Sequence, residues 1–235
     1  HYANMFFCLV RTNAEGKPQQ GISFLLIDMK TPGLKVRPIK TLDQGADVNE
    51  VFLDNVEVPV ENLVGEGHRG WAIAKYLLGY ERTNIAGIGM CKRLLSRLKD
   101  LAARETKRGK PLLEDPRFRE KVARLEIQVL SHEWSLMRVI SLDQAGGDVS
   151  TEASMLKIRG SEIQMALGAL LMECSGPNAV QYSPEWLEGS QGGEMPGGAQ
   201  LAGLAAQYFD LRKVAIYGGT NEVQRNIIAR SVVGL

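Results

Sequence analysis

Cysteine and histidine are scarce in this sequence, with three of each among 235 residues. Cys8, Cys91 and Cys174 lie far apart, and their spacing matches no zinc-binding pattern. An odd number of thiols also cannot pair completely. We therefore expect free thiols in a reducing compartment and no metal site.

Charge of one sign is not in excess, because 28 lysines and arginines offset 27 aspartates and glutamates for a net charge of +1. This balance argues against nucleic acid or an anionic membrane as the partner. The longest mostly apolar stretch, residues 163–176, is shorter than the roughly 20 residues that cross a bilayer. The sequence also has no P-loop, no complete GxGxxG fingerprint and no suggestion of a Ser/His/Asp arrangement.

The first third of the chain is predicted to form strands. Apolar residues fill the segments 5–11 and 22–29, and a polar turn containing glycine and proline separates them. Residues 34–39 and 48–59 alternate apolar and polar side chains with the period of a strand. The chain enters the first strand almost at once, without an initiator Met or a signal-peptide pattern, so we expect an upstream part to be missing. We predict part of an antiparallel β-barrel over residues 1–66.

The hydrophobic period changes to that of a helix after Gly65. Residues 188–198 are rich in glycine and are expected to form an exposed loop, and Ser150 is a candidate N-cap. Long helices with short breaks are typical of an antiparallel bundle. We therefore predict an α+β chain with a four-helix bundle over residues 67–235. The expected helices cover residues 69–108, 116–145, 151–175, 200–215 and 221–233.

The stretch IYGGTNEVQRNIIA, residues 216–229, places two glycines directly before a predicted helix. Gly218 and Gly219 can adopt positive φ and let a ligand approach the backbone, and Thr220 suits the N-cap. The helix start would offer N–H groups and a positive dipole to an anionic group, although Glu222 in the first turn competes for them. Physical reasoning alone favours the alternative, in which glycine closes the preceding helix as its C′ residue.

Glu81 falls in the middle of an apolar stripe when this segment is placed on a helix. Burial there would disfavour the charged form and raise the carboxyl pKa above its ordinary value of about 4.3. A carboxyl group with a raised pKa suits a general base near neutral pH. The pattern alone slightly favours the alternatives, which are an ion pair across the bundle or a rotation to the surface beside Arg82. The stripe consists of Ala74, Leu77, Leu78, Ile85 and Ile88.

Two other sets of residues have ordinary structural interpretations. The three histidines form no ligand pattern, so we expect each at the surface or in a cap. Ile127, Leu130, Trp134 and Met137 recur with helical spacing, and we expect this stripe in the core rather than around a cofactor.

Three segments of the chain resemble parts of one protein family. VNEVFLDNVEVPVENLVGEGHRGW, residues 48–71, resembles the stretch that links the middle β-domain to the C-terminal helices in acyl-CoA dehydrogenases. YGGTNEVQRNIIAR, residues 217–230, resembles the family's C-terminal signature, and residues 21–39 fit its middle-domain strands. The resemblance covers nearly the whole chain. It implies the second part of the β-domain followed by the entire helical domain, with the N-terminal helical domain absent.

The resemblance implies FAD as the cofactor and α,β-dehydrogenation of an acyl-CoA thioester. A carboxylate base removes the α-proton while the β-hydride goes to the flavin. Many relatives have this base in the C-terminal motif, at the position of Gly218. Isovaleryl-type and long-chain-type members have glycine there and take the base from the first helix of the C-terminal domain, where the matching residue is Glu81. Gly218 would then offer its N–H to the thioester oxygen.

The same resemblance assigns further site residues. The C-terminal motif contributes the cofactor-binding positions Gly219, Thr220 and Glu222. The positions that line or support the acyl site are Tyr80, Arg82 and Tyr217.

Two segments depart from the family pattern that serves the FAD of a neighbouring subunit. Glu105 stands where relatives have the arginine of an RxxFG motif, so that Arg104 or Arg108 would have to replace it as a cofactor-binding residue. Glu173 and Pro177 stand where relatives have Gln and Gly. A carboxylate near a pyrophosphate is electrostatically unfavourable.

These departures leave alternatives open. The resemblance implies a homo- or hetero-oligomer that forms through the helical domain and passes electrons to electron-transfer flavoprotein or a similar acceptor. The chain would be a dehydrogenase, of a heteromeric or pimeloyl-CoA type among others, or an FAD-poor partner subunit with a structural or shared-site role. A third alternative is a relative with other flavin chemistry. We expect a bacterial-type cytoplasmic protein of fatty-acid β-oxidation, and we expect the isolated chain to be inactive.

Overall fold

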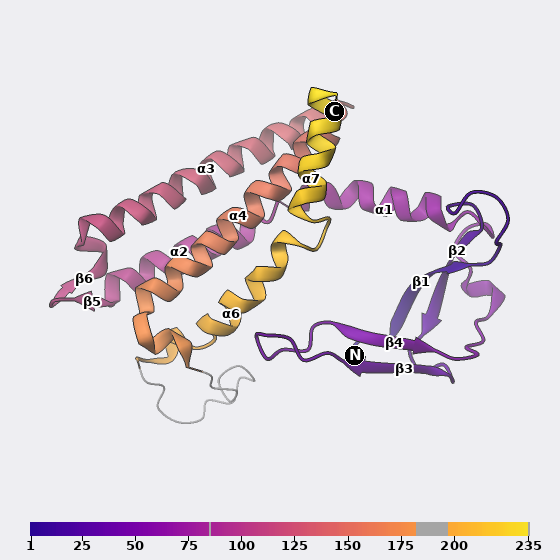
Figure 1. The fold of residues 1–235 in the computed structure, drawn as a ribbon, viewed down its shortest axis with the longest axis horizontal. Helices are drawn as coiled ribbons and strands as arrows, with labels where there is room; N and C mark the ends of the chain where they lie inside the picture. The colour runs from indigo at the N-terminus through magenta and orange to yellow at the C-terminus, as the bar shows by residue number, and fades with distance from the viewer. Residues whose placement is uncertain (85, 182–196, 235) are drawn as a thin grey trace. The chain divides into compact units, whose positions relative to one another are not determined.

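The computed structural model describes residues 1–84, 86–181 and 197–234, without the side chains of residues 78–83. The chain divides into two compact units, His1–Glu81 and Arg82–Leu235. Figure 1 traces the elements of both units, and each unit is described by itself.

Two antiparallel hairpins form most of the first unit. β1 (Met5–Arg11) pairs with β2 (Ile22–Asp28), and β3 (Leu34–Pro38) pairs with β4 (Asn49–Leu53). The four strands predicted from the period-two pattern are confirmed. The last strand ends earlier than the alternating pattern predicts, because Asn55 adopts a left-handed φ of 50° and interrupts the extended backbone.

The partial barrel predicted over residues 1–66 is not observed. Within the described ranges, β1 pairs with β2 alone and β3 pairs with β4 alone, so each sheet has two strands. A barrel requires its strands to be paired along both edges. The third two-stranded sheet lies in the second unit, where β5 (Thr106–Lys107) pairs with β6 (Lys110–Pro111).

The single helix predicted over residues 69–108 is two helices. α1 (Gly70–Asn84) ends before Gly87, and α2 (Ile88–Arg104) begins after it. Gly87 has a left-handed φ of 62°, which a right-handed helix cannot include. A side chain at this position would also meet α4, because a Cβ there would lie 2.4 Å from Nε2 of Gln164. The break places Ile88 on a different helix from Glu81, so the stripe that singled out Glu81 does not run along one helix.

α4 (Ser150–Ser175) is the central helix of the second unit. It packs against α2, α3 (Pro116–Gln144), α6 (Leu204–Asp210) and α7 (Asn221–Ile228). The chain reverses direction between α2, α3 and α4, which lie side by side in Figure 1. The largest fully buried side chains of α4 are Leu156, Ile163, Leu167 and Leu171. A helix with neighbours on several faces has to be apolar on several faces, which explains its sequence.

The ends of the helices follow local capping chemistry. Asp115 accepts a 3.0 Å hydrogen bond from the backbone N–H of Arg117, so it caps α3 with Pro116 at the first position. The predicted N-cap of α4 is wrong, since Ser150 already lies in the helix and its N–H donates to the Asp148 carboxylate at 2.9 Å.

The last two predicted helices change type along their length. The segment predicted as a helix over residues 200–215 consists of α6 between two 3-10 turns, Ala199–Leu201 and Leu211–Ala215. The final helix continues from α7 into a π-type turn, Ala229–Val233. Among the helices that the structure describes, none is long and apolar enough to cross a membrane.

The predicted core stripe on α3 is wrong, because its four side chains are between 50% and 73% exposed. We call Ile127, Leu130, Trp134 and Met137 the outer α3 stripe. α3 turns a different set of residues toward α2 and α4, with heptad spacing: Phe118, Val122, Leu125, Val129, His132, Leu136 and Val139. The surface position predicted for His132 is therefore also wrong. Its ring is 4% exposed, and Nε2 lies 2.7 Å from the carbonyl oxygen of Ala86.

Candidate functional site

The glycine turn before α7 has the backbone conformation that the sequence allows. Gly218 and Gly219 adopt φ values of 64° and 85°, and Thr220 is extended with φ −61° and ψ 153°. The Thr220 hydroxyl oxygen accepts a 3.2 Å hydrogen bond from the N–H of Val223, which confirms the predicted N-cap. The preceding 3-10 turn has its C-cap at Ile216, so neither glycine is its C′ residue. The turn is a feature of the α7 start rather than a helix-closing device.

The turn is braced from within α7. Nε2 of Gln224 donates to the carbonyl oxygen of Gly218 at 3.1 Å. A Cβ on Gly219 would lie 2.3 Å from the same nitrogen, so a side chain would displace the brace as well as strain the backbone. Gly218 and Tyr217 are exposed, which leaves the backbone of this turn open to a ligand.

Glu222 occupies part of the α7 start. Hydrogen bonds from its own N–H and from the Thr220 hydroxyl lower the pKa of this exposed carboxyl group, and the nearby Arg225 and Lys157 act in the same direction. A charged carboxylate here suits an amino or hydroxyl donor of a nucleotide better than a phosphate. Glu222 therefore remains compatible with a nucleotide contact and competes with an anion.

A buried polar network lies behind this turn, and sequence reasoning missed it. Lys157 on α4 is 2% exposed, and its Nζ lies 2.8 Å from Oδ1 of Asn221, the first residue of α7. Burial lowers the pKa of this ammonium group, and the Glu222 charge opposes that effect. Ser161, one turn further along α4, also contacts Asn221. A lysine in the apolar sequence SMLKIRGS was the available signal, because lysine is almost never fully buried without a partner.

Glu105 and Glu173, which both depart from the family pattern, line one cavity of about 400 Å³. Glu105 follows α2, and Glu173 lies in the last turn of α4, where its carboxylate accepts from Nζ of Lys121 at 2.5 Å. Lys107 is likewise engaged by Asp115 at 2.9 Å. Of the described residues, three carboxylates and three basic groups line this cavity, so the formal charges of these six side chains balance. The residues present do not fit a pyrophosphate, because the carboxylates would repel it and two of the bases are already paired.

Arg104 and Arg108 do not line that cavity. Arg104 instead lines a cavity of about 570 Å³ together with Arg93 and Arg97. Arg97 is engaged there, because its guanidinium donates to Gln207 Oε1 at 3.0 Å and to two backbone carbonyls. Arg108 is exposed in the β5–β6 turn with φ 56°. The structure therefore does not bring either arginine into the place that Glu105 occupies.

The predicted base and two predicted substrate contacts lie on α1. The backbone of Tyr80, Glu81 and Arg82 is helical, and their side chains lie outside the described residues. The structure therefore leaves the role of Glu81 as a prediction.

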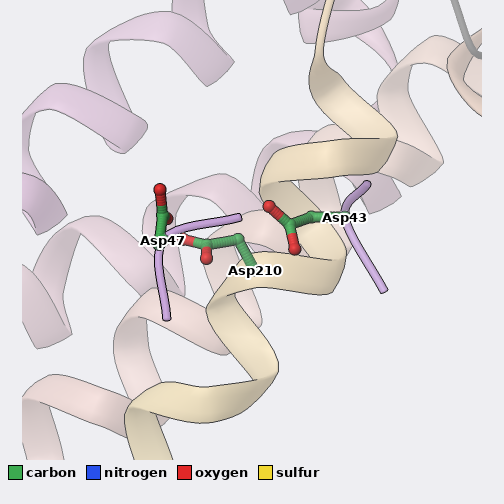
Figure 2. A group of neighbouring side chains, drawn as sticks. All are labelled: Asp43, Asp47 and Asp210. Carbon is green, nitrogen blue, oxygen red and sulfur yellow. The ribbon is translucent and has the colours of Figure 1, made fainter. Parts of the chain in front are cut away.

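Figure 2 labels three aspartates that we describe separately, because they belong to different units. Asp43 and Asp47 lie in the segment between β3 and β4 of the first unit. Asp210 ends α6 in the second unit and forms an ion pair with Lys213. Asp47 is exposed and the other two are half-buried, and we assign no metal to them.

The helical unit, which contains the capped glycine turn, matches a known protein family. A family profile described as "Acyl-CoA dehydrogenase, C-terminal domain" matches residues 68–233. The chain therefore belongs to the acyl-CoA dehydrogenase family, and the resemblance seen in its motifs is confirmed.

Several relatives match over the whole of this chain. The acyl-CoA dehydrogenase IpdE1 of Mycobacterium tuberculosis is 30% identical over 241 residues, covering 100% of this chain and 56% of that protein. The acyl-CoA dehydrogenase FadE34 of the same organism is 29% identical over 237 residues, covering 100% of this chain and 29% of that protein. A solved structure of the ChsE4-ChsE5 complex from Mycobacterium tuberculosis matches with a TM-score of 0.81 and 26% identity, covering 100% of this chain and 58% of that chain. The chain thus spans less than two thirds of each relative.

Proposed function

We propose that the protein containing this chain is an FAD-dependent acyl-CoA dehydrogenase in which Glu81 is the base. The observation that carries the proposal is the turn at Gly218, where a glycine with φ 64° stands at the position that holds the base in many relatives. Because this position has no side chain, the base has to come from elsewhere, and α1 offers a carboxyl group followed by Arg82.

Each residue of the proposed site has a chemical task. FAD, when bound, accepts the β-hydride of the substrate. Glu81 removes the α-proton, and the N–H of Gly218 donates to the thioester oxygen, where negative charge develops. The exposed backbone of the turn supports this second task. Tyr80, Arg82 and Tyr217 would line or support the acyl site.

The remaining contacts of the proposed site belong to the cofactor and its electron acceptor. Gly219, Thr220 and Glu222 would contact the nucleotide part of FAD. Electron-transfer flavoprotein or a similar carrier would receive the electrons.

The test uses the whole protein with its flavin bound. Glu81→Gln keeps the size of the side chain and removes the base, so we expect flavin to remain bound and its visible absorbance to persist when a series of acyl-CoA thioesters is added anaerobically. The matched control is Glu120→Gln, which removes an exposed carboxylate on α3 that has no assigned role in the site and should still allow flavin reduction. Normal flavin reduction in Glu81→Gln would overturn the assignment of the base.

A second candidate function is favoured by Glu105 and Glu173. We propose, as the alternative, an FAD-poor partner subunit of a heteromeric dehydrogenase. The cavity that these carboxylates line does not fit a pyrophosphate, and a relative of known structure is a complex of two different chains, ChsE4 and ChsE5. Flavin counted per chain discriminates the two functions. If the carboxylates exclude FAD, the double variant Glu105→Arg/Glu173→Gln should raise the flavin content, and Glu114→Gln nearby should not.

We further propose that the chain assembles through its helical domain with a second domain of the same family, from another copy or a homologous subunit. The outer α3 stripe supports this proposal, because four large apolar side chains recur with heptad spacing on one exposed helix face. Trp134→Glu should reduce the mass measured by light scattering, whereas Ser135→Glu, on a neighbouring polar position, should not. An unchanged mass in Trp134→Glu would exclude the stripe as the interface.

The domain plan is part of the same proposal. We place the boundary after residue 66, which the start of the family match at residue 68 supports, whereas the division into compact units leaves α1 as far as Glu81 with the first unit. The packing of α2, α3 and α4 with the C-terminal helices supports a four-helix bundle. We propose a cytoplasmic location, which fractionation of the host cell would test.

A further inference from the structure

Lys157 is a buried cation, and among the described residues the charge that favours its ammonium form is the exposed carboxylate of Glu222. The Lys157 side chain is 2% exposed in the middle of α4, and its hydrogen-bond partner is the neutral amide of Asn221 at 2.8 Å. Transfer of a charge from water into a protein interior is costly unless the charge is paired. An apolar residue of similar length would avoid this cost, so stability alone does not explain a lysine here.

The network around Lys157 has a defined direction. Nζ of Lys157 donates to Oδ1 of Asn221, and Nδ2 of Asn221 donates to the Ser161 hydroxyl at 3.0 Å. The Ser161 hydroxyl can then donate to the Ile158 carbonyl at 2.8 Å. Because an ammonium group can only donate, it determines that Oδ1 of the Asn221 amide faces Lys157 and that Nδ2 faces Ser161. Asn221 itself is 5% exposed, so water does not compete for these bonds.

Asn221 is the first residue after the Gly218–Thr220 turn. Two adjacent glycines with positive φ give this turn little stiffness of its own. Contacts with other residues therefore have to hold both ends of the turn. At one end, the Gln224 side chain donates a hydrogen bond to the Gly218 carbonyl. The bond from Lys157 fixes the other end against the central helix of the unit.

We propose that Lys157 is a positioning residue. It acts through Asn221 to hold the Gly218 N–H in the position from which it donates a hydrogen bond to the thioester oxygen. The inference rests on the proposed function for its catalytic consequence, and on the contacts above for the anchoring itself. Lys157 would thus contribute to catalysis without touching the substrate or the flavin.

The anchor should matter more for the chemical step than for substrate binding. A hydrogen bond to the thioester oxygen strengthens as negative charge develops there, so a displaced Gly218 N–H weakens the transition state more than the bound substrate. Loss of a whole oxyanion donor lowers kcat by about 100-fold to 1,000-fold in other enzymes. For a displaced but present donor, we expect a loss of roughly 10-fold in kcat with KM changed less than about threefold.

The experiment measures kcat, KM, flavin content and amide hydrogen exchange in the whole protein. Lys157→Met and Asn221→Ala should each lower kcat, and the double variant should be no slower than either alone, because both remove one anchor. Asn221→Asp keeps the acceptor and should retain kcat. Amides of residues 217–223 should exchange faster in the first two variants and not in Asn221→Asp.

Val129→Ala is the matched control, since it destabilises a buried site on α3 without contact to the network. It should lower the melting temperature and leave kcat per flavin and exchange at the turn unchanged. Unchanged exchange and kcat in both Lys157→Met and Asn221→Ala would overturn the positioning role, as would an equal loss of kcat in Val129→Ala. If the wild type reduces no flavin with any acyl-CoA, the proposed function fails, and hydrogen exchange alone decides whether Lys157 anchors the turn. If Lys157→Met does not fold, the comparison of Asn221→Ala with Asn221→Asp decides it.

Discussion

The ammonium nitrogen of Lys157 lies 2.8 Å from the side-chain oxygen of Asn221 and so joins the middle of α4 to the first residue of α7. The two residues are 64 positions apart in the sequence. Their contact attaches the residue that follows the open Gly218–Thr220 turn to the buried middle of α4. The turn therefore combines an exposed backbone with a buried attachment, which is the combination a binding loop requires.

Replacing Gly219 with alanine should destabilise the turn. Its φ of 85° is unfavourable for any residue with a Cβ, at a cost of about 1–2 kcal/mol. The new Cβ would also displace the Gln224 brace from the Gly218 carbonyl. Denaturant unfolding of the whole protein measures the cost. Gly67→Ala, where no atom of the described residues lies within 4 Å of the new Cβ, should change stability little, and an equal loss there would refute the explanation.

Gly160→Ala should be more disruptive than an ordinary helical substitution. A Cβ at Gly160 on α4 would lie 2.1 Å from the carbonyl oxygen of Ala86 and 3.0 Å from Nε2 of His132. Because the nearest atom is backbone, the connection between α1 and α2 would have to move, and overpacking of this kind costs about 1–3 kcal/mol. At Gly89 on α2, no atom of the part of the chain that the structure describes lies within 4 Å of an added Cβ, so Gly89→Ala should be neutral or stabilising. Similar melting temperatures for the two variants would contradict this packing.

The buried histidine predicts a pH dependence. Burial is the main cause that lowers the pKa of His132, opposed by its hydrogen bond to Ala86. The unfolded chain therefore binds a proton at a pH at which the folded chain does not. The free energy of unfolding should fall as the pH decreases through about 6.5, the ordinary value of histidine, and His132→Gln should reduce that slope. Chemical denaturation between pH 8 and pH 5, with the variant as reference, measures it, and identical slopes would show that His132 does not contribute.

The three thiols should differ in reactivity. Burial raises the pKa values of Cys91 and Cys174 to about 12, while Cys8 on β1 is only half-buried. At pH 8, about one in ten thousand of the two buried groups is a thiolate, so alkylation of the native protein should modify Cys8 first. Mass spectrometry of the modified peptides measures the order. In denaturant all three should react at similar rates, and fast native labelling of Cys174 would contradict its burial.

Local sequence patterns predict where the helices and strands of this chain lie better than they predict which face of a helix is buried. The period-two strands and the capped α3 follow from neighbouring residues. On α3, however, the outer stripe at Trp134 and the inner heptad at His132 both have helical spacing, so only the position of α4 decides which is buried. The break at Gly87 has the same origin, because Gln164 on α4 approaches the chain there.

The candidate site was predictable where the motif is continuous in sequence. The turn from Gly218 to Thr220 has the conformation and the cap that its residues favour. The contact of Lys157 with Asn221 was not predictable, because it depends on the packing of α4 against α7. Glu105 and Glu173 were identified as departures from two separate family motifs, and the structure shows that both line one cavity.

The most direct test of the central claim measures exchange of the substrate α-hydrogen with deuterium oxide. In the whole protein, with the flavin chemically reduced so that hydride transfer is blocked, a base still exchanges the α-proton of a saturated acyl-CoA. NMR of the recovered thioester should show exchange in the wild type and in Glu120→Gln, and none in Glu81→Gln. Exchange in Glu81→Gln at the wild-type rate would contradict the account, because another group would then be the base.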